Sequence, residues 1–210
     1  MGKKQIHTCY IWDFPLYKKD PRNDIEVVKK WAELMKLTDI VVGWNSDRFD
    51  NRVMYGRLLI HKLPPVMLPQ SVDVMKAFRK IAAYDSYKLD DVSDSLGHGR
   101  KRHTDIDLWY DCVMGDLKAQ KNMVTYNKRD VEITELDYID VMPHMANHPN
   151  MALLLGKPDG CRVCGGTEFE GAGWKYTRTQ KYRRFQCKNK TCRAYNASTI
   201  REPIAKTMHT

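Results

Sequence analysis

The order of apolar and polar positions predicts a body of alternating α and β elements. Residues 24–37 and 117–141 carry apolar side chains at helical spacing, and the second run ends before Pro143. The β-branched run at 40–44 is bounded by turn residues and indicates a buried strand. The other expected elements are a strand over 5–12, a helix over 51–61, a strand and a helix within 71–81, and a helix over 88–96. This order indicates an α/β fold.

Charge divides the chain into two parts. The net charge is +9, and residues 157–210 hold 12 Lys and Arg against 4 Asp and Glu. The first 156 residues therefore contribute only +1. Pro and Gly flank the segment 149–160, so we expect a body over 1–155 and a small domain over 156–210. A basic tail of this kind favours a polyanion such as nucleic acid as its partner.

Composition indicates a soluble globular chain, with 42% hydrophobic and 29% charged residues. No apolar run approaches the ~20 residues that a membrane helix needs. The start of the sequence lacks the apolar region of a signal peptide. We therefore expect no membrane partner and a location in the cytoplasm of a bacterium or a phage-infected host. There, cysteines are more often thiols or metal ligands than disulfides.

Two short motifs carry candidate chemistry. The stretch IVVGWNSDRFDN places Asn45, Phe49 and Asp50 just after the expected strand, at the sheet edge where ligand crevices of α/β proteins lie. In the long helix, Tyr126 and Asp130 are four residues apart and share one face. The second pattern alone is weak, because a half-buried Tyr beside a solvated Asp is the commoner situation.

Taken in order, GWNSDRFD, YKLDDVSDSLG and YNKRD resemble motifs of the 3′–5′ exonucleases of the ribonuclease H-like superfamily. The likeness is to the branch with a tyrosine in the last motif. It is strongest to exonuclease domains of family B DNA polymerases and to stand-alone phage and bacterial relatives. The resemblance covers roughly residues 1–155. It implies an α/β ribonuclease H-like fold and metal-dependent 3′–5′ digestion of DNA.

The resemblance also implies roles for single residues. Asp50 and Asp130 would be carboxylate ligands of Mg²⁺ or Mn²⁺, in a site that holds two ions ~4 Å apart. Tyr126 would orient the attacking water through its hydroxyl group. Asn45 and Phe49 would contact the terminal nucleotide, with the ring of Phe49 stacking on a base.

The first motif of the family, Asp-x-Glu on an opening strand, has no clear counterpart. Asp24-Ile25-Glu26 matches it as text, but these residues begin a predicted helix only 26 residues before Asp50. Asn23 or Asp24 is placed to cap this helix, so we interpret Asp24 as part of a helix start and not as a metal ligand. Asp13 has no second carboxylate beside it. The chain is thus expected to begin after the first two strands of the family, which leaves the sheet with open edges.

This departure leaves two classes of function open. An exonuclease would need a second polypeptide to supply the missing carboxylates. Alternatively, the chain is a catalytically inactive nucleic-acid-binding or scaffold protein that retains the fold. A split gene, a truncated relic and a misassigned start are all compatible with the sequence.

The tail contains two cysteine pairs, Cys161 with Cys164 and Cys187 with Cys192, separated by 22 residues. The arrangement resembles a zinc ribbon, in which four thiolates hold one structural Zn²⁺. The alternatives are a redox-active pair and disulfides. A small domain with few aliphatic residues needs such a cross-link to fold.

Cations alternate with aromatic residues between the two pairs, from Trp174 to Phe185. The pattern favours nucleic-acid binding, with bases on the rings and phosphates on the cations. The candidate contacts are Arg178, Lys181, Arg183 and Arg184. Aromatic packing with solvated cations is the alternative, and both can hold. A basic loop at 97–103 is either solvated or a further backbone contact.

Overall fold

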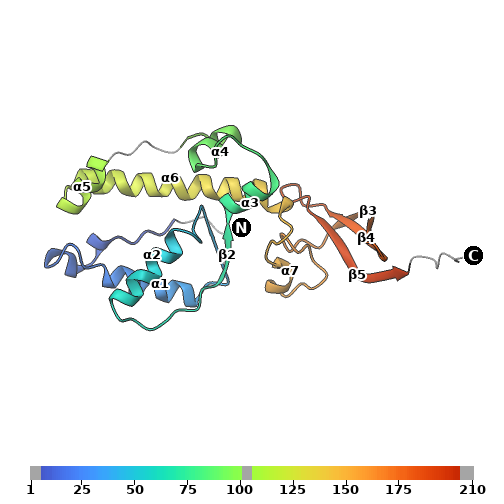
Figure 1. Ribbon diagram of the computed structural model, residues 1–210, viewed down its shortest axis with the longest axis horizontal. Helices are drawn as coiled ribbons and strands as arrows, with labels where there is room; N and C mark the ends of the chain where they lie inside the picture. The colour runs from blue at the N-terminus through green and yellow to red at the C-terminus, as the bar shows by residue number, and fades with distance from the viewer. Residues whose placement is uncertain (1–5, 101–105, 204–210) are drawn as a thin grey trace, which may run out of the picture. The chain divides into compact units, whose positions relative to one another are not determined.

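The computed structural model describes residues 6–100 and 106–203 (Figure 1). The chain forms two compact units, residues 1–138 and 139–210. The predicted boundary at 155/156 lies C-terminal to this division, because the intervening segment packs with the tail. Met142 packs against the cysteine cluster, and the Met151 amide donates to the Arg162 carbonyl at 2.8 Å.

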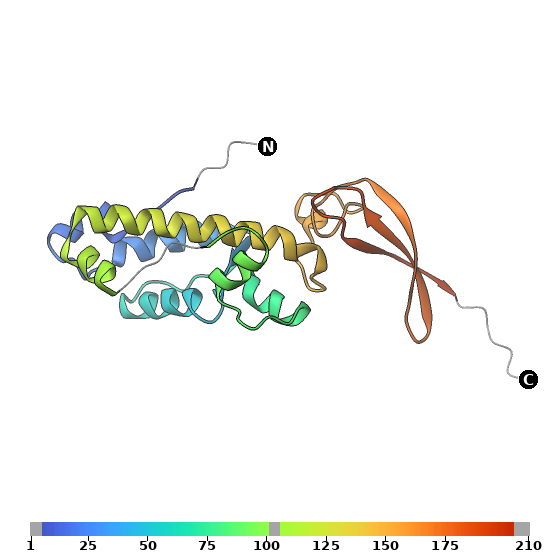
Figure 2. The same cartoon turned by 90° about the horizontal axis from the view of Figure 1, so that it is seen from above.

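The first unit is mainly helical, with one small sheet. Its elements are η1 (Ile11–Asp13), η2 (Pro15–Lys18), α1 (Ile25–Lys36), β1 (Ile40–Gly43), α2 (Asp50–Ile60), β2 (Gln70–Asp73), α3 (Val74–Ile81), α4 (Leu89–Ser95), α5 (Ile106–Met114) and most of α6 (Leu117–Val141). The helices predicted over 24–37, 51–61, 88–96 and 117–141 are confirmed, whereas α5 was not anticipated. Seen from above, α6 runs as one continuous helix (Figure 2).

The strand predicted over 5–12 is wrong. Residues 6–10 have no regular structure and lead into the 3₁₀ helix η1. The Tyr10 amide donates to the Asp13 carboxylate at 2.7 Å, which closes a tight turn where a strand would have to continue. No described strand pairs with this segment, and a strand without a partner leaves its backbone groups unsatisfied.

Strands β1 and β2 are parallel, in register from Ile40 opposite Gln70 to Gly43 opposite Asp73. Among the described residues, the other edge of β1 pairs with no strand, and Val42 is 36% exposed. Within the described part of the chain, β1 therefore has an open edge. A two-stranded sheet is marginal alone, so the helices around it provide much of the stability.

Two apolar clusters hold the helices of this unit. Val28, Leu58 and Val66 are buried between α1 and α2, with partly buried side chains such as Trp31 around them. A second cluster joins α5 to the start of α6 through buried Cys112 and its neighbours on α6. Both clusters use side chains at helical spacing, and this periodic pattern predicted α1, α2 and α6 but not α5.

Of the two expected caps of α1, the Asn23 side chain makes the bond and the Asp24 side chain does not. Asp24 occupies the N-cap position of α1 without a capping bond, and the Asn23 side chain accepts from the Ile25 amide instead. The Asp24 carboxylate accepts hydrogen bonds from Arg57 at 2.7 Å and meets His61 at 2.6 Å. Burial would raise the pKa of Asp24, but these two partners outweigh it and lower the pKa. The carboxylate thus joins α1 to α2.

A buried carboxylate also ties α4 to α6. Asp137 is fully buried, accepts from the Ser93 hydroxyl at 2.6 Å and lies 2.7 Å from His98 Nδ1. Arg129 of α6 donates to the His98 carbonyl at 2.6 Å. These contacts fix the first part of the basic loop predicted at 97–103. Its residues 101–103 lie outside the described part of the chain.

The second unit is built around sulfur. It contains the end of α6, η3 (Met142–His144), α7 (Met151–Leu154) and an antiparallel sheet of β3 (Phe169–Tyr176), β4 (Gln180–Cys187) and β5 (Tyr195–Pro203), with β4 in the middle. Its buried core consists of the cysteines 161, 187 and 192 with Val163 and Ala194. Few aliphatic side chains contribute, so the cysteine cluster forms most of the core of this unit.

Candidate functional site

The loop between β1 and α2 is organised by one buried carboxylate. Asp73 ends β2 and is 5% exposed. It accepts from the backbone amides of Asn45 at 3.1 Å, Asp47 at 3.4 Å and Lys76 at 3.2 Å. The parallel register makes this possible, because it places Asp73 beside Gly43. Sequence reasoning missed Asp73, although an acid between a strand and a helix is a recognisable N-cap signal.

Asn45 and Phe49, the predicted nucleotide contacts, lie in this loop. Asn45 adopts φ 56°, a left-handed conformation that Asn tolerates better than most residues. Its carbonyl accepts from the Phe49 amide at 3.1 Å, which starts the turn into α2. Among the described residues, the buried Asn45 Oδ1 has no hydrogen-bond partner. Phe49 is 63% exposed, so its ring is available to a ligand.

Two carboxylates of the same loop differ in their electrostatics. Burial would raise the pKa of Asp47, but Lys76 at 2.8 Å and the Ser71 hydroxyl outweigh it and lower the pKa. Partial burial raises the pKa of Asp50, its own backbone amide opposes this, and the nearby Asp73 raises it further. Among the described residues, the Asp50 carboxylate at the start of α2 makes no ion pair, and its backbone amide only partly offsets the effects of burial and Asp73. A divalent cation would compensate the charge of this carboxylate.

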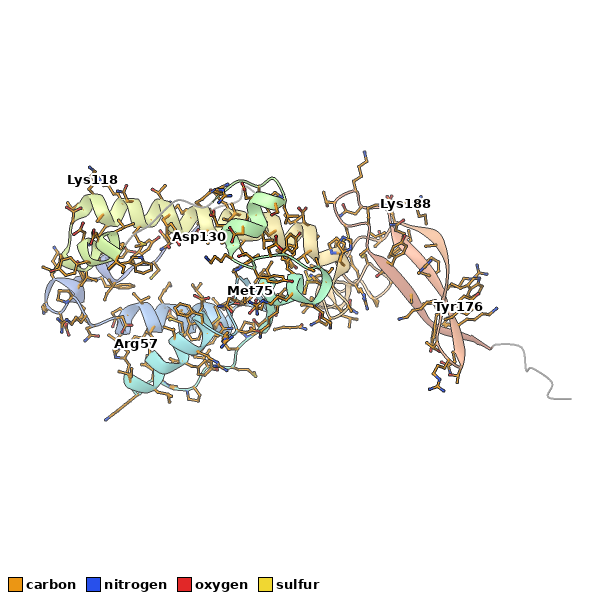
Figure 3. The ribbon with its side chains drawn as sticks, turned by 45° about the horizontal axis from the view of Figure 1, so that its top comes forward. Arg57, Met75, Lys118, Asp130, Tyr176 and Lys188 are labelled. Atoms are coloured by element: carbon orange, nitrogen blue, oxygen red, sulfur yellow. The ribbon has the colours of Figure 1, made fainter. Side chains whose placement is uncertain are left out.

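Tyr126 and Asp130 both lie on α6, as predicted. Tyr126 packs against the cluster of Cys112, Ala119 and Met123. Asp130 is half-buried, with one carboxylate oxygen out of contact with solvent (Figure 3).

The acids do not form a complete two-ion site. In residues 6–100 and 106–203, no acidic group belongs to a cluster of three or more potential metal ligands. Asp50 and Asp130 offer one carboxylate each, which suits at most one divalent ion, whereas a closely spaced pair needs further ligands. The residues present therefore do not fit the two-ion arrangement that the resemblance implies.

The four tail cysteines do converge. Their Sγ atoms all lie within 4.8 Å of one another, with 3.8 Å between Cys161 and Cys192 and 3.6 Å between Cys164 and Cys187. Four thiolates at ~2.3 Å from one ion would be ~3.8 Å apart, the edge of a tetrahedron. A disulfide requires ~2.05 Å. The cluster thus fits one tetrahedral ion.

The surroundings of the sulfurs suit metal thiolates. The Gly166 amide donates to Cys164 Sγ at 3.4 Å, and the Asn196 side chain donates to Cys161 Sγ at 3.3 Å. Without an ion, burial and crowded neighbours raise the pKa of Cys187 to about 11. Burial opposes the Cys161 thiolate too, but its hydrogen bonds leave the pKa of Cys161 lowered. A dication removes the conflict between closely placed thiolates.

The predicted nucleic-acid contacts lie on the sheet of the second unit. Lys181 and Arg183 are two residues apart on β4 and both approach the Trp174 ring, at 4.5 and 4.4 Å from its centroid. Arg184 lies 5.0 Å over the Tyr195 ring and donates to the Ala172 carbonyl at 2.8 Å.

Two further residues of the β3–β4 hairpin, Arg178 and Tyr176, are exposed to solvent. Arg178 is exposed between β3 and β4, and the Tyr176 ring is 66% exposed (Figure 3). The sheet therefore presents cations close to aromatic rings. This arrangement is compatible with nucleic-acid contact and with aromatic packing beside solvated cations, so both interpretations stay open.

Comparison with known proteins now identifies the family. Residues 6–139 match the RNase H superfamily, which is more than half of the chain. The chain therefore belongs to the RNase H superfamily, whose nucleases act on nucleic acids and usually use divalent metal ions. Comparison with curated proteins finds no match. None of the described helices combines the length and apolar character that crossing a membrane requires.

The two loop carboxylates should respond oppositely to neutralisation. Asp47→Asn should lower the free energy of unfolding by about 0.5–1 kcal/mol at neutral pH, because a partly exposed ion pair is removed. Asp50→Asn should raise it by less than about 1 kcal/mol, because an uncompensated charge is removed. Urea unfolding of both variants measures the difference.

The pH dependence of the two variants follows from the pKa directions. Asp47, with a lowered folded pKa, stabilises the protein above the unfolded value of about 4 and loses this effect as pH falls through the folded pKa. Asp50, with a raised pKa, destabilises it above the folded pKa and not below about 4. Changes of the same sign in both variants at neutral pH would contradict this account.

Metal content tests the cysteine cluster. The purified protein should hold about one equivalent of a thiol-binding dication such as Zn²⁺, since a site of four thiolates is closed. Chelation should unfold residues 139–210 and largely spare residues 1–138, as followed by limited proteolysis. Cys164→Ser should lose the metal, while the matched variant Cys9→Ser should retain it. A metal-free reduced protein with unchanged proteolysis would rule the site out.

Proposed function

We propose that this RNase H superfamily member is a 3′–5′ exonuclease-type nuclease acting on DNA, completed by carboxylates from a second polypeptide. One observation supports it above the others. The Asp73-fixed loop presents Asn45, Phe49 and Asp50 together at the carboxyl end of β1. The second exonuclease motif would use these three residues. Phe49 and Asp50 are exposed, and Asn45 Oδ1 has no hydrogen-bond partner among the described residues.

The proposed roles follow from the surroundings of each residue. The exposed Phe49 ring stacks on the base of the terminal nucleotide. Asn45, whose buried Oδ1 has no hydrogen-bond partner among the described residues, contacts the same nucleotide after a rotation of its side chain. Asp50 and Asp130 each give one carboxylate toward Mg²⁺ or Mn²⁺, which when bound neutralises charge on the phosphate. Tyr126 holds a water through its hydroxyl.

The open edge of β1 gives a second polypeptide a place to dock. A strand added along Ile40–Gly43 would find unpaired backbone groups among the described residues. Its carboxyl end would then lie beside the loop that carries Asp50. An acidic strand there would supply the ligands that Asp50 and Asp130 lack.

The second unit is proposed to be a zinc ribbon that holds the nucleic acid. Zn²⁺ is the ion that best matches four thiolates at tetrahedral spacing. Arg178, Lys181, Arg183 and Arg184 contact the phosphates, and the aromatic rings contact bases. The excess of positive charge in residues 157–210 agrees with this role.

The second candidate is a catalytically inactive nucleic-acid-binding or scaffold protein. It is favoured by the pairing of Asp24 with Arg57 and His61, which engages the carboxylate that matched the first motif as text. Under this alternative, the cations beside the aromatic rings of the second unit form the functional surface. Asp50 is then a remnant of a former catalytic site.

Release of mononucleotides from a 5′-labelled oligonucleotide separates the two candidates. With Mg²⁺ or Mn²⁺, the chain alone should digest DNA weakly or not at all, because its carboxylates are too few. Adding an N-terminal fragment that carries an Asp-x-Glu strand should restore 3′–5′ digestion. Asp50→Asn or Asp130→Asn should abolish the restored activity, and Asp47→Asn should retain it.

Two outcomes would overturn parts of this account. Robust digestion by the lone chain that is lost in Asp24→Ala or Glu26→Ala would restore these residues as the first motif. Persistent inactivity with the acidic strand present would favour the inactive binding protein.

Binding measured against salt tests the nucleic-acid surface. Affinity for single-stranded DNA should fall steeply with salt, because binding of phosphates by Lys and Arg releases counterions. In Arg183→Ala with Arg184→Ala, the slope of log K against log salt should fall by about 1 for each phosphate that is no longer neutralised. The charge-matched variant Lys29→Ala with Lys30→Ala on α1 should keep the slope. An unchanged slope in the first variant would move the binding surface elsewhere.

A further inference from the structure

The first unit contains a cavity that the proposed nuclease site does not use. It has a volume of about 610 Å³ and is bounded by the segment before η1, by α1 and α2, and by α5 and α6. Asn45, Phe49, Asp50 and Asp130 do not line it. A volume of this size is typical of small-molecule sites, which combine apolar walls with a few polar groups.

Aromatic rings form much of the cavity wall. Tyr10 and Trp12 are stacked with 4.7 Å between their centroids and 3° between their planes. Asn127 of α6, which also lines the cavity, forms a side-chain hydrogen bond with Tyr10. Trp109 of α5 adds a third ring and is 55% exposed. Rings of this kind bind a flat π system by offset stacking.

The charge at the cavity edge is positive. Arg57 lines the cavity, but its guanidinium is bound to Asp24, which also lines it (Figure 3 labels Arg57). Arg22 is exposed at the same edge, and among the described residues its guanidinium makes no ion pair or hydrogen bond. The charges of Arg57 and Asp24 nearly cancel, so Arg22 gives the cavity lining a net positive charge. Its guanidinium can bind an anion.

Flat rings beside one available guanidinium define the chemistry of a ligand. The rings require a planar aromatic group, and Arg22 requires an anion such as a phosphate monoester, which it binds through two parallel hydrogen bonds. A nucleotide has both parts in one molecule. An apolar ligand would leave Arg22 unused, and an inorganic anion would leave the rings unused.

We propose that this cavity binds a nucleotide, with its base against the rings of Tyr10, Trp12 and Trp109 and its phosphate on Arg22. The same chemistry is present in a free mononucleotide and in the 5′-phosphorylated end of a strand. The inference does not depend on the proposed nuclease activity, because none of these side chains has a role there.

Titration of the full chain with dAMP, with deoxyadenosine and with a 5′-phosphorylated oligonucleotide tests the proposal, without added divalent metal. Saturable quenching of tryptophan fluorescence by dAMP is expected, confirmed by calorimetry. Trp109→Ala should weaken dAMP binding by about tenfold, the scale of one base-stacking contact. The matched variant Tyr110→Ala, which removes an exposed ring outside the cavity on the same helix, should leave it unchanged.

The role of Arg22 has its own readout. Arg22→Ala should weaken binding of dAMP and leave binding of deoxyadenosine unchanged, whereas Lys19→Ala should change neither. If dAMP and deoxyadenosine bind the native chain equally, or if no nucleotide binds at millimolar concentration, the proposal is wrong. Binding of the phosphorylated strand but not dAMP would assign the cavity to strand ends. Unchanged dAMP binding in Asp50→Asn would show that the cavity and the proposed nuclease site are separate.

Discussion

The arrangement of the candidate site depends on the buried carboxylate of Asp73. Its hydrogen bonds to the amides of Asn45, Asp47 and Lys76 join the ends of two parallel strands to the starts of two helices. A buried charge is tolerated only when such donors satisfy it. Because the loop is fixed in this way, Asn45 can hold a left-handed conformation and Asp50 projects from the first turn of α2 without a compensating partner.

The same fold agrees with the proposal that a second polypeptide completes the site. A parallel sheet is normally covered and flanked on both sides, yet β1 has one edge that pairs with no described strand. Among the described residues, neither Asp50 nor Asp130 belongs to a cluster of three or more potential metal ligands. The second unit is stabilised differently. Its cysteine cluster takes the place of an aliphatic core and holds the three-stranded sheet that carries the cations. The proposed function thus places nucleic-acid contact and chemistry in separate units.

Features that depend on residues close together in the sequence could be predicted from it. The bounds of α6 followed from its apolar period and from Pro143, and the cysteine spacing predicted a cluster whose sulfurs do converge. Contacts between distant residues were not predictable. Asp24 sits where a cap is expected, but Arg57, 33 residues away, takes its carboxylate. The strand pattern at 5–12 required a neighbouring strand that the sequence could not supply. The cap at Asp73 had a local signal that was overlooked, whereas its bonds to the Asn45 and Asp47 amides, 28 and 26 residues away, could not be predicted from the sequence.

The central claim is that Asp50 and Asp130 form half of a nuclease metal site. Titration with Mn²⁺, followed by electron paramagnetic resonance of the free ion, tests it most directly. The account predicts one weak site in the native chain besides the cysteine cluster. That site should be lost in Asp50→Asn and in Asp130→Asn and kept in Asp47→Asn, and its affinity should decline as pH falls through the raised pKa of Asp50. Two tightly bound ions in the lone chain, or weak binding that survives both substitutions, would contradict the claim.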